Sequence, residues 1–399
     1  MRRHRISVLA VLAAGIIASP QSGAFAADSI AISSVFSQLT TIPALANPSV
    51  IVLDEKSGEV VYESNSKSAR KPASVIKLLS ATAAYTYLNP SDSYTTTLSA
   101  GIDGKSVVIN GSLDPWVSDN VKLAETLKRT SLQRFEFNAL GAIKRMNSGI
   151  TDGTTIFYNQ LYTSEVNHIK RFLRERGVTI AVKPISEESA LSKSGKLLLS
   201  STSPTLETII DWTLTWSDNV LAERIARLAS LAAGNTLDEA GVAKTFKTIL
   251  DTYGISTSNL VVKDASGLSK ENRVTASQIA KLLMVIYHDP KFAKLINGLP
   301  VGGVSGTLQK RFIETAPTAV GLVRAKTGTL NGTTNLAGFV ESGDHEYIFV
   351  ILADRHSKSY SVTQKVRATV DRILGKIATP LLPPLLPIAP LGETVTTTN

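Results

Sequence analysis

The segments with strand character lie at the two ends of this chain, and a long helical stretch separates them. Near the N-terminus, residues 49–53 and 60–62 flank a turn that contains Gly58, which predicts a β-hairpin. Near the C-terminus, three more apolar or alternating runs predict strands, at 323–329, 335–341 and 347–353. Because an isolated hairpin is only marginally stable in water, we expect both ends to contribute to one sheet. The order of elements predicts an α/β protein of the α+β type, with a central antiparallel sheet flanked by helices.

The middle of the chain divides into a helical body and an insertion of different character. Apolar residues recur at helical spacing in several segments: 75–88, 165–176, 203–233, 276–288 and 360–377. Between 94 and 163, short β-like runs alternate with Gly and Asp turns around one charged helix near 121–129. We therefore expect a smaller β-rich inserted subdomain at 94–163, and a main body formed by 27–93 and 164–378.

The two terminal segments are expected to lie outside the folded body. Residues 1–26 combine Arg2, Arg3 and Arg5, an apolar run too short to span a bilayer, and the small-residue site Ala24-Phe25-Ala26, which is typical of a secretory signal peptide. This predicts export to an extracytoplasmic space such as a cell wall or periplasm. The tail at 379–399 is rich in proline, which excludes a continuous helix there and with it a transmembrane segment in the mature chain.

Composition excludes several kinds of chemistry. The 399 residues include no cysteine, so thiol nucleophiles, disulfides and cysteine metal sites are impossible. The five histidines form no His-Glu-x-x-His pattern or other ligand spacing, and we expect neither a metal nor another cofactor. The net charge is +9, but basic residues do not alternate with aromatic ones, and an exported protein makes a nucleic-acid partner unexpected.

A Ser-x-x-Lys motif follows Pro72. Ser74 and Lys77 stand three residues apart in the first turn of an apolar helix, so both project from one face. A lysine in an apolar setting can accept the proton of a serine hydroxyl, and a helix N-terminus offers backbone donors to an oxyanion. Taken alone, the motif also fits an ordinary helix start with a surface lysine. Ser68 and Lys71 repeat the spacing in a polar stretch that we interpret as a solvated loop.

A Ser-Asp-Asn triplet occurs twice. Ser217, Asp218 and Asn219 lie between two strongly apolar helical segments, where a break in the helix can be aimed at a cleft. The same triplet at 118–120 lies in the β-rich insertion. Ordinary helix capping would explain either triplet. The position between two buried helices favours Ser217 as the functional copy.

The third motif is an alternating strand with the sequence Val-Arg-Ala-Lys-Thr-Gly-Thr at 323–329. Gly328 has no side chain, so a ligand backbone could lie close along an edge strand and bind by strand addition. Lys326 offers a cation, and Thr327 and Thr329 offer hydroxyls, which together suit a terminal carboxylate. An exposed strand with a glycine bulge is the alternative explanation.

Together and in this order, the three motifs resemble the signature of penicillin-binding proteins and serine β-lactamases. The chain is similar to the low-molecular-mass class C penicillin-binding proteins, the D-Ala-D-Ala carboxypeptidase/endopeptidase family of penicillin-recognising serine enzymes, from about 48 to 353. The segments that carry this resemblance, besides the motifs, are 111–115, 264–276, 299–308, 326–332 and 336–338. The interval from Ser74 to Ser217 is shorter than expected for members with two large inserted domains, so one insertion is expected to be reduced or missing.

The resemblance implies a serine β-lactamase/transpeptidase-like domain and a serine D-alanyl-D-alanine carboxypeptidase, with or without endopeptidase action. It implies an acyl-enzyme on Ser74, Lys77 as the leading base and Ser217 as a proton relay. Asn219, Lys326, Thr327, Gly328 and Thr329 would bind the substrate, with the backbone N–H groups of Ser74 and Thr329 as the oxyanion hole. The implied partners are peptidoglycan stem peptides ending in D-Ala-D-Ala and β-lactam antibiotics as inhibitors.

Two alternatives compete with this interpretation. A β-lactamase would need efficient deacylation, and no Glu-x-x-Leu-Asn loop that could supply a deacylating glutamate occurs in the chain. A catalytically silent wall-binding scaffold would retain the fold without the chemistry, and the three intact motifs argue against it.

Overall fold

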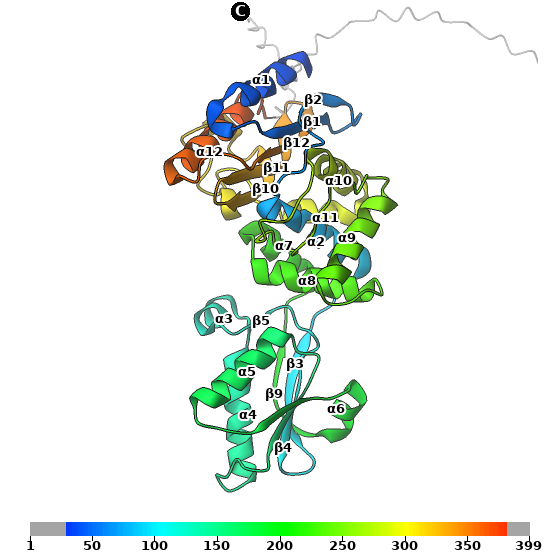
Figure 1. Ribbon diagram of the computed structural model, residues 1–399, viewed down its shortest axis with the longest axis vertical. Helices are drawn as coiled ribbons and strands as arrows, with labels where there is room; N and C mark the ends of the chain where they lie inside the picture. The colour runs from blue at the N-terminus through cyan, green and yellow to red at the C-terminus, as the bar shows by residue number, and fades with distance from the viewer. Residues whose placement is uncertain (1–28, 381–399) are drawn as a thin grey trace, which may run out of the picture.

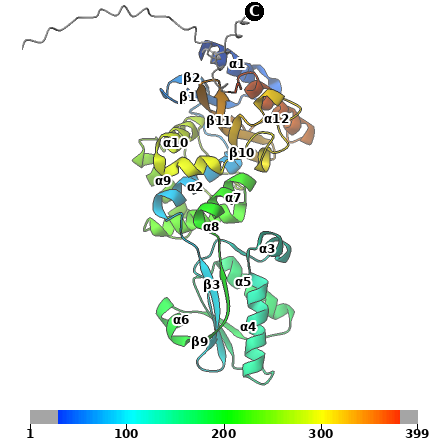
Figure 2. The same cartoon turned by 180° about the vertical axis from the view of Figure 1, so that it is seen from behind.

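The computed structural model describes residues 29–380, as two lobes stacked along the long axis of the molecule (Figures 1 and 2). The signal peptide predicted at 1–26 and all but the start of the proline-rich tail lie outside the described residues. No helix in the described part of the chain combines the length and the apolar character that crossing a bilayer would require.

The larger lobe is built on one five-stranded sheet in the order β10-β11-β12-β1-β2, with every neighbouring pair antiparallel. The pairing of β1 with β12 joins the N-terminal hairpin to the C-terminal strands, from Ser49 opposite Leu352 to Asp54 opposite Tyr347. The expectation that both ends of the chain share a sheet is therefore confirmed. The strands are β1 (Ser49–Asp54), β2 (Val60–Ser64), β10 (Val323–Leu330), β11 (Thr333–Ser342) and β12 (His345–Ala353).

Both faces of this sheet are covered, and strand alternation assigns each residue to a face. Val50 and Val52 pack with the terminal helices α1 and α12, whereas Ile51 and Leu53 pack with the central helices. This two-sided burial explains why the strands read as nearly continuous apolar runs. The helices are α1 (Ser29–Thr41), α2 (Lys77–Tyr87), α7 (Leu206–Trp216), α8 (Asn219–Ala232), α9 (Glu239–Thr252), α10 (Ala276–His288), α11 (Ala293–Asn297) and α12 (Tyr360–Gly375), with 3₁₀ turns η1 (Pro43–Leu45), η2 (Ala73–Ile76), η3 (Pro290–Phe292), η4 (Gly306–Leu308) and η5 (Pro317–Ala319).

The smaller lobe has its own sheet, in the order β8-β7-β4-β3-β9, and its own apolar core. In Figure 1 it forms the lower end of the molecule, and β3 and β9 lead up to the helices α7 and α8. Its elements are β3 (Thr95–Gly101), β4 (Ser106–Asn110), β5 (Val117–Ser118), α3 (Val121–Leu127), β6 (Thr130–Ser131), α4 (Leu132–Met146), β7 (Thr155–Asn159), α5 (Thr163–Glu175), β8 (Ala181–Pro184), α6 (Glu187–Lys193) and β9 (Ser194–Thr202).

The C-terminal boundary of this insertion differs from the one expected from the sequence. The prediction placed the insertion at 94–163 and returned the chain to the body at 164, but β9 pairs antiparallel with β3, with Thr202 opposite Thr95. The helix α5 also belongs to the smaller lobe, because Ile169 and Phe172 lie in its core. The insertion therefore extends to Thr202. An amphipathic helix signal at 165–176 does not reveal which of two cores receives its apolar face.

Candidate active site

The Ser-x-x-Lys segment begins as a 3₁₀ turn. The helix expected over 75–88 is present, but η2 forms its first turn and regular α-helix starts at Lys77. Ala73, directly before Ser74, has a φ of 45°, which is an unfavourable conformation for a residue with a side chain. Such a backbone persists only where its surroundings fix it. The contacts around this turn are described next.

Three buried side chains hold the backbone ahead of Ser74. Asn335 Nδ2 donates hydrogen bonds to the carbonyl oxygens of Lys71 and Pro72, each at 2.8 Å. Asp354 accepts a hydrogen bond from the Lys71 N–H at 3.1 Å and forms a 3.2 Å ion pair with Arg70. The turn that carries Ser74 is therefore tied to β11 and to the residue that follows β12.

A second loop packs behind the same turn. Gly267 has a φ of +88°, and a Cβ at this position would lie 2.0 Å from the carbonyl oxygen of Ala73. The loop is shaped by Asp264, which accepts from the Asn272 side chain at 3.1 Å, and by Glu223 of α8, which accepts from the N–H groups of Ala265 and Ser266 at 2.8 and 2.9 Å. This arrangement presents the Ser266 carbonyl to the interior of the site.

Lys77 lies completely buried behind Ser74. Its Nζ donates to Ser74 Oγ at 2.8 Å, to Asn219 Oδ1 at 2.7 Å and to the carbonyl oxygen of Ser266. Burial lowers the pKa of Lys77 to about 8, although the charges of Asp264, Asp218 and Glu223 oppose the shift. About one molecule in ten would then carry neutral Lys77 at pH 7.

The Ser-Asp-Asn triplet at 217–219 lies at the break between α7 and α8. Ser217 ends α7 in the left-handed conformation, with a φ of 61°. Asp218 caps α8 by accepting from the Leu221 N–H at 3.0 Å, which fixes the direction in which the chain leaves the turn. The copy at 118–120 also caps a helix, the short α3 of the insertion, through Asn120, but Ser118 does not line the groove that Ser74 and Ser217 share.

The insertion braces this turn from outside. Arg129, which is buried, forms an ion pair with Asp218 at 2.7 Å, and its guanidinium lies over the ring of Trp116. Arg224 of α8 donates to the carbonyl oxygens of Pro115 and Val117 at 3.2 and 2.6 Å. The two lobes are thus joined by polar contacts at the turn between α7 and α8.

Lys326 is also fully buried, and it contacts the second serine. Its Nζ donates to Ser217 Oγ at 2.9 Å and to the Thr327 carbonyl oxygen at 3.1 Å. Burial, and then the nearby charge of Lys77, hold the pKa of Lys326 well below its ordinary value. The site therefore contains two serine–lysine pairs, Ser74 with Lys77 and Ser217 with Lys326.

The strand β10 forms one edge of the main sheet, and its C-terminal half is open on the outer side in the described part of the chain. The Ala325 N–H donates outward to the Pro300 carbonyl at 2.9 Å, and the Val323 carbonyl accepts from the Gly302 N–H at 2.8 Å. Residues two apart in a strand direct their backbone groups to the same edge. The N–H groups of Thr327 and Thr329 therefore point to the open edge, beside the turn that carries Ser74.

Gly328 has a different role from the one expected. The sequence suggested that its missing side chain makes room for a ligand backbone. In the structure a Cβ on Gly328 would lie 2.7 Å from the Pro72 carbonyl oxygen and 3.2 Å from Val75. The space is used by the chain's own backbone, which lets β10 approach the turn that carries Ser74.

A groove of about 910 Å³ runs along this edge. Four of the predicted site residues line it: Ser74, Ser217, Thr327 and Thr329. The other four predicted residues do not line the groove and lie behind those that do: Lys77, Asn219, Lys326 and Gly328. Several further lining residues were not predicted as site residues, and all but Thr307 lie outside the segments that carry the resemblance: Thr307, Lys310, Arg311, Glu314, Asn335, Gln364, Arg367 and Asp371.

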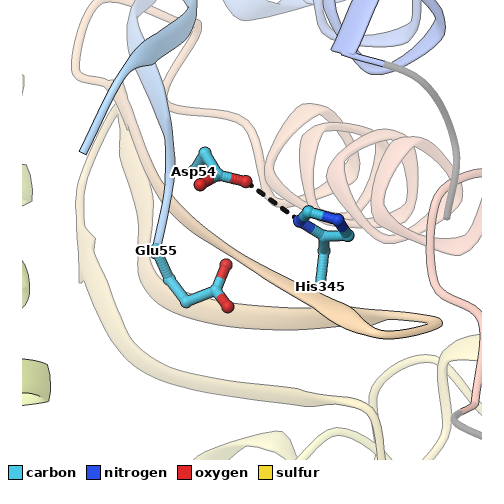
Figure 3. A group of neighbouring side chains, drawn as sticks. All are labelled: Asp54, Glu55 and His345. Carbon is cyan, nitrogen blue, oxygen red and sulfur yellow. Dashed lines mark hydrogen bonds and ion pairs between the residues drawn. The ribbon is translucent and has the colours of Figure 1, made fainter. Parts of the chain in front are cut away.

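One cluster of possible metal ligands lies outside the groove. Asp54, Glu55 and His345 have ligand atoms within 4.8 Å of one another, where β1 ends and β12 begins (Figure 3). Asp54 Oδ2 is 3.1 Å from His345 Nδ1, and Asp54 Oδ1 accepts from the N–H and hydroxyl of Ser57 at 2.9 Å each. Burial raises the pKa of Asp54, but these contacts outweigh it and lower the pKa. The three residues could bind a divalent cation if His345 released Asp54; as arranged, they join the end of β1 to the start of β12.

Comparison with known proteins gives a family and several relatives. The family model of the "D-Ala-D-Ala carboxypeptidase 3 (S13) family" matches residues 32–138 and 133–377. "Carboxypeptidase DacB" of Mycolicibacterium smegmatis is 41% identical over 128 residues, which are 31% of this chain and 28% of that protein. The "D-alanyl-D-alanine carboxypeptidase" of Actinomadura sp. (strain R39) is 34% identical over 171 residues, 41% of this chain and 31% of that protein. The matched segments thus span about a third or less of these curated relatives.

Two solved structures show the same fold. Penicillin binding protein 4 (dacB) from Haemophilus influenzae superposes with a TM-score of 0.64 at 17% identity, covering 86% of this chain and 98% of that one. A predatory endopeptidase from Bdellovibrio bacteriovorus, solved in complex with an immunity protein, gives 0.54 at 16% identity, covering 82% and 93%. The fold expected from the sequence is confirmed.

Proposed function

Because this chain belongs to the D-Ala-D-Ala carboxypeptidase 3 (S13) family, we propose that it is a serine D-alanyl-D-alanine carboxypeptidase that acts on peptidoglycan stem peptides. One observation carries the proposal. Two buried serine–lysine pairs, with Nζ–Oγ distances of 2.8 and 2.9 Å, converge on a groove beside an open strand edge. This combination supplies an activated nucleophile, a proton relay and a binding edge for an extended peptide.

Acylation would begin when Ser74 Oγ attacks the carbonyl carbon of the penultimate D-Ala and its proton passes to neutral Lys77. The resulting oxyanion would accept hydrogen bonds from the backbone N–H groups of Ser74 and Thr329. The C–N bond would then break, and the proton held by Lys77 would pass by way of the Ser217 hydroxyl to the leaving D-Ala nitrogen, which leaves Lys77 neutral again. Lys326 Nζ, 2.9 Å behind this hydroxyl, supports the relay.

Deacylation would require a water molecule to attack the ester formed on Ser74, with the same lysine accepting its proton. The carboxylic product would leave and Ser74 would be restored. Asn219 would share its side chain between Lys77, which its Oδ1 contacts at 2.7 Å, and the amide of the bound peptide. A β-lactam would acylate the same serine and remain attached, which makes such antibiotics the expected inhibitors.

The substrate also bears on location. A stem peptide that ends in D-Ala-D-Ala belongs to the cell wall, so the enzyme would act in an extracytoplasmic space. This agrees with the signal peptide expected at 1–26, which lies outside the described residues.

The decisive experiment is incubation with a muramyl pentapeptide. The purified wild-type protein should release free D-Ala, and Ser74→Ala should abolish the release. Covalent labelling by penicillin without release of any product would reject the peptidase and favour the silent scaffold. Rapid turnover of the β-lactam would favour the β-lactamase.

Endopeptidase action on cross-linked peptides is a second candidate. The groove continues past Thr329 along residues 310–315 and α12, so it extends beyond the space that a single leaving D-Ala would fill. Cleavage of cross-linked muropeptide dimers should therefore be measured separately. If dimers stay intact while pentapeptides lose D-Ala, the carboxypeptidase alone is supported.

A further inference from the structure

We propose that the guanidinium of Arg367, together with the hydroxyl of Thr329, binds the C-terminal carboxylate of the substrate and gives the groove its charge selectivity. Arg367 belongs to none of the three motifs and lies in the middle of α12. The proposal rests on the carboxypeptidase function proposed above, because it assigns a binding role within that same groove.

The lysine of the strand motif is poorly placed for this role. Lys326 is fully buried, and its Nζ already donates to Ser217 Oγ and to the Thr327 carbonyl oxygen. Its surroundings also disfavour a full charge, as burial and the charge of Lys77 lower its pKa. A carboxylate in the groove must therefore find its positive partner elsewhere.

Arg367 is the cation that meets the motif strand from the groove side. It is half-buried, lines the groove, and its Nη2 donates to Thr329 Oγ1 at 3.2 Å. The neighbouring Arg311 differs, because its guanidinium is held by the carboxylate of Asp371. Arg367 forms no ion pair with a carboxylate anywhere in the described part of the chain. An unpaired guanidinium in a partly desolvated groove is suited to bidentate binding of a carboxylate.

The position of Thr329 matches the chemistry of the substrate. Its backbone N–H points to the open edge, where the oxyanion would form, and its hydroxyl contacts Arg367. In a peptide the terminal carboxyl carbon is three bonds from the scissile carbonyl carbon, roughly 3 to 4 Å away. The backbone N–H and side-chain Oγ1 of one threonine are also three bonds apart. One residue can therefore contact the reacting carbonyl while directing the carboxylate toward Arg367.

The test compares a peptide ending in D-Ala-D-Ala with the same peptide ending in a C-terminal amide. For the wild type we expect a kcat/KM that is about 10- to 100-fold higher for the acid, the range of a charge-assisted hydrogen bond. Arg367→Gln should lose most of this factor on the acid and little on the amide. Arg367→Lys should recover part of it. Arg372→Gln, which removes an exposed arginine of the same helix, is the matched control and should behave as wild type.

A second measurement does not depend on turnover. In the Ser74→Ala background, calorimetry should show tighter binding of the acid than of the amide, and Arg367→Gln should remove the difference. Equal binding of both peptides by Ser74→Ala, or an equal loss on acid and amide in Arg367→Gln, would overturn the carboxylate site. If the wild type released no D-Ala while this binding difference persisted, the proposed peptidase function would fail and the carboxylate site would stand.

Discussion

Arg129 of the inserted lobe and Asp218, at the turn between α7 and α8, form a 2.7 Å ion pair in which the arginine is nearly inaccessible to solvent. Asp218 caps α8 with its other oxygen, so a single carboxylate joins the helix start, the turn that carries Ser217 and the insertion. The insertion therefore contacts the site through Asp218, the residue that fixes the turn of Ser217.

Because of this ion pair, we expect a substitution of Arg129 in the insertion to affect the reaction at the site in the larger lobe. Arg129→Ala should lower the free energy of unfolding by about 2 kcal/mol, less than for a fully buried pair because Asp218 retains some contact with water. It should also slow acylation, since Ser217 loses its outer support. Urea denaturation and the rate of penicillin labelling measure the two effects. Arg134→Ala, at an exposed position of α4, is the control. A wild-type acylation rate in Arg129→Ala would contradict the bracing role.

The pKa of Lys77 predicts the pH dependence of acylation. The neutral amine is the form that accepts a proton, and its fraction rises with pH through a pKa of about 8. The acylation rate should therefore increase from pH 6 to about pH 8 and then level off. Stopped-flow measurement with benzylpenicillin gives this profile. Lys77→Ala should reduce the rate by roughly 10²- to 10⁴-fold. A rate that falls as the pH rises through 8 would exclude Lys77 as the base.

Replacing Asn335 tests how far the turn that carries Ser74 depends on β11. Asn335→Ala removes the side-chain donor to the carbonyl oxygen of Lys71 and one of two donors to that of Pro72, which also accepts from the Val75 N–H, and this should cost about 1–3 kcal/mol of unfolding free energy. Because the same contacts hold Ala73 at a positive φ, acylation should slow even in the folded protein. Circular dichroism would verify folding before the labelling rate is measured. Unchanged stability together with an unchanged rate would show that the clamp is dispensable.

A substitution at Gly328 tests a steric contact without any change in charge. In Gly328→Ala the new methyl group would meet the Pro72 carbonyl oxygen at 2.7 Å and should push β10 away from the turn that carries Ser74. We expect lower stability and a loss of acylation. Gly141→Ala is the matched control, because Gly141 lies inside α4 and its new methyl group would meet only the flexible end of Arg145. That change should stabilise the protein by about 0.5–1 kcal/mol. Full acylation by Gly328→Ala would disprove the close fit.

Much of the larger lobe could be predicted because its signals are local. The strands 323–329, 335–341 and 347–353 alternate or are continuously apolar, and the helix over 276–288 was placed at the observed bounds. The helices α4 and α9 were missed, although Ser131 and Asp238 cap them and apolar residues follow at intervals of three and four. These caps are the sequence signals from which α4 and α9 could be predicted.

The site could be predicted only in part, for a physical reason. Ser74 and Lys77 lie on one turn of helix, so their contact follows from spacing, and the two Ser-Asp-Asn copies could be separated by their surroundings. The roles of Glu223, Asn335 and Arg367 depend on which loop or strand lies opposite them in the folded molecule. The contact between Gly328 and Pro72 is also non-local. It shows that the missing side chain makes room for the chain's own backbone, whereas the sequence suggested room for a ligand.

The order of strands in the main sheet also determines the order in which the two lobes can fold. The strand β1 lies between β2 and β12, so the first hairpin has no partner on one side until the last strands have been synthesised. The insertion, in contrast, pairs only its own strands between Thr95 and Thr202 and can fold while the rest of the chain is still emerging. Closing the long loop between β1 and β12 is entropically slow, and β10 joins the sheet through β11. No fragment that ends before β12 should react with penicillin, because Ser74 acquires its second serine–lysine pair only when the sheet is complete.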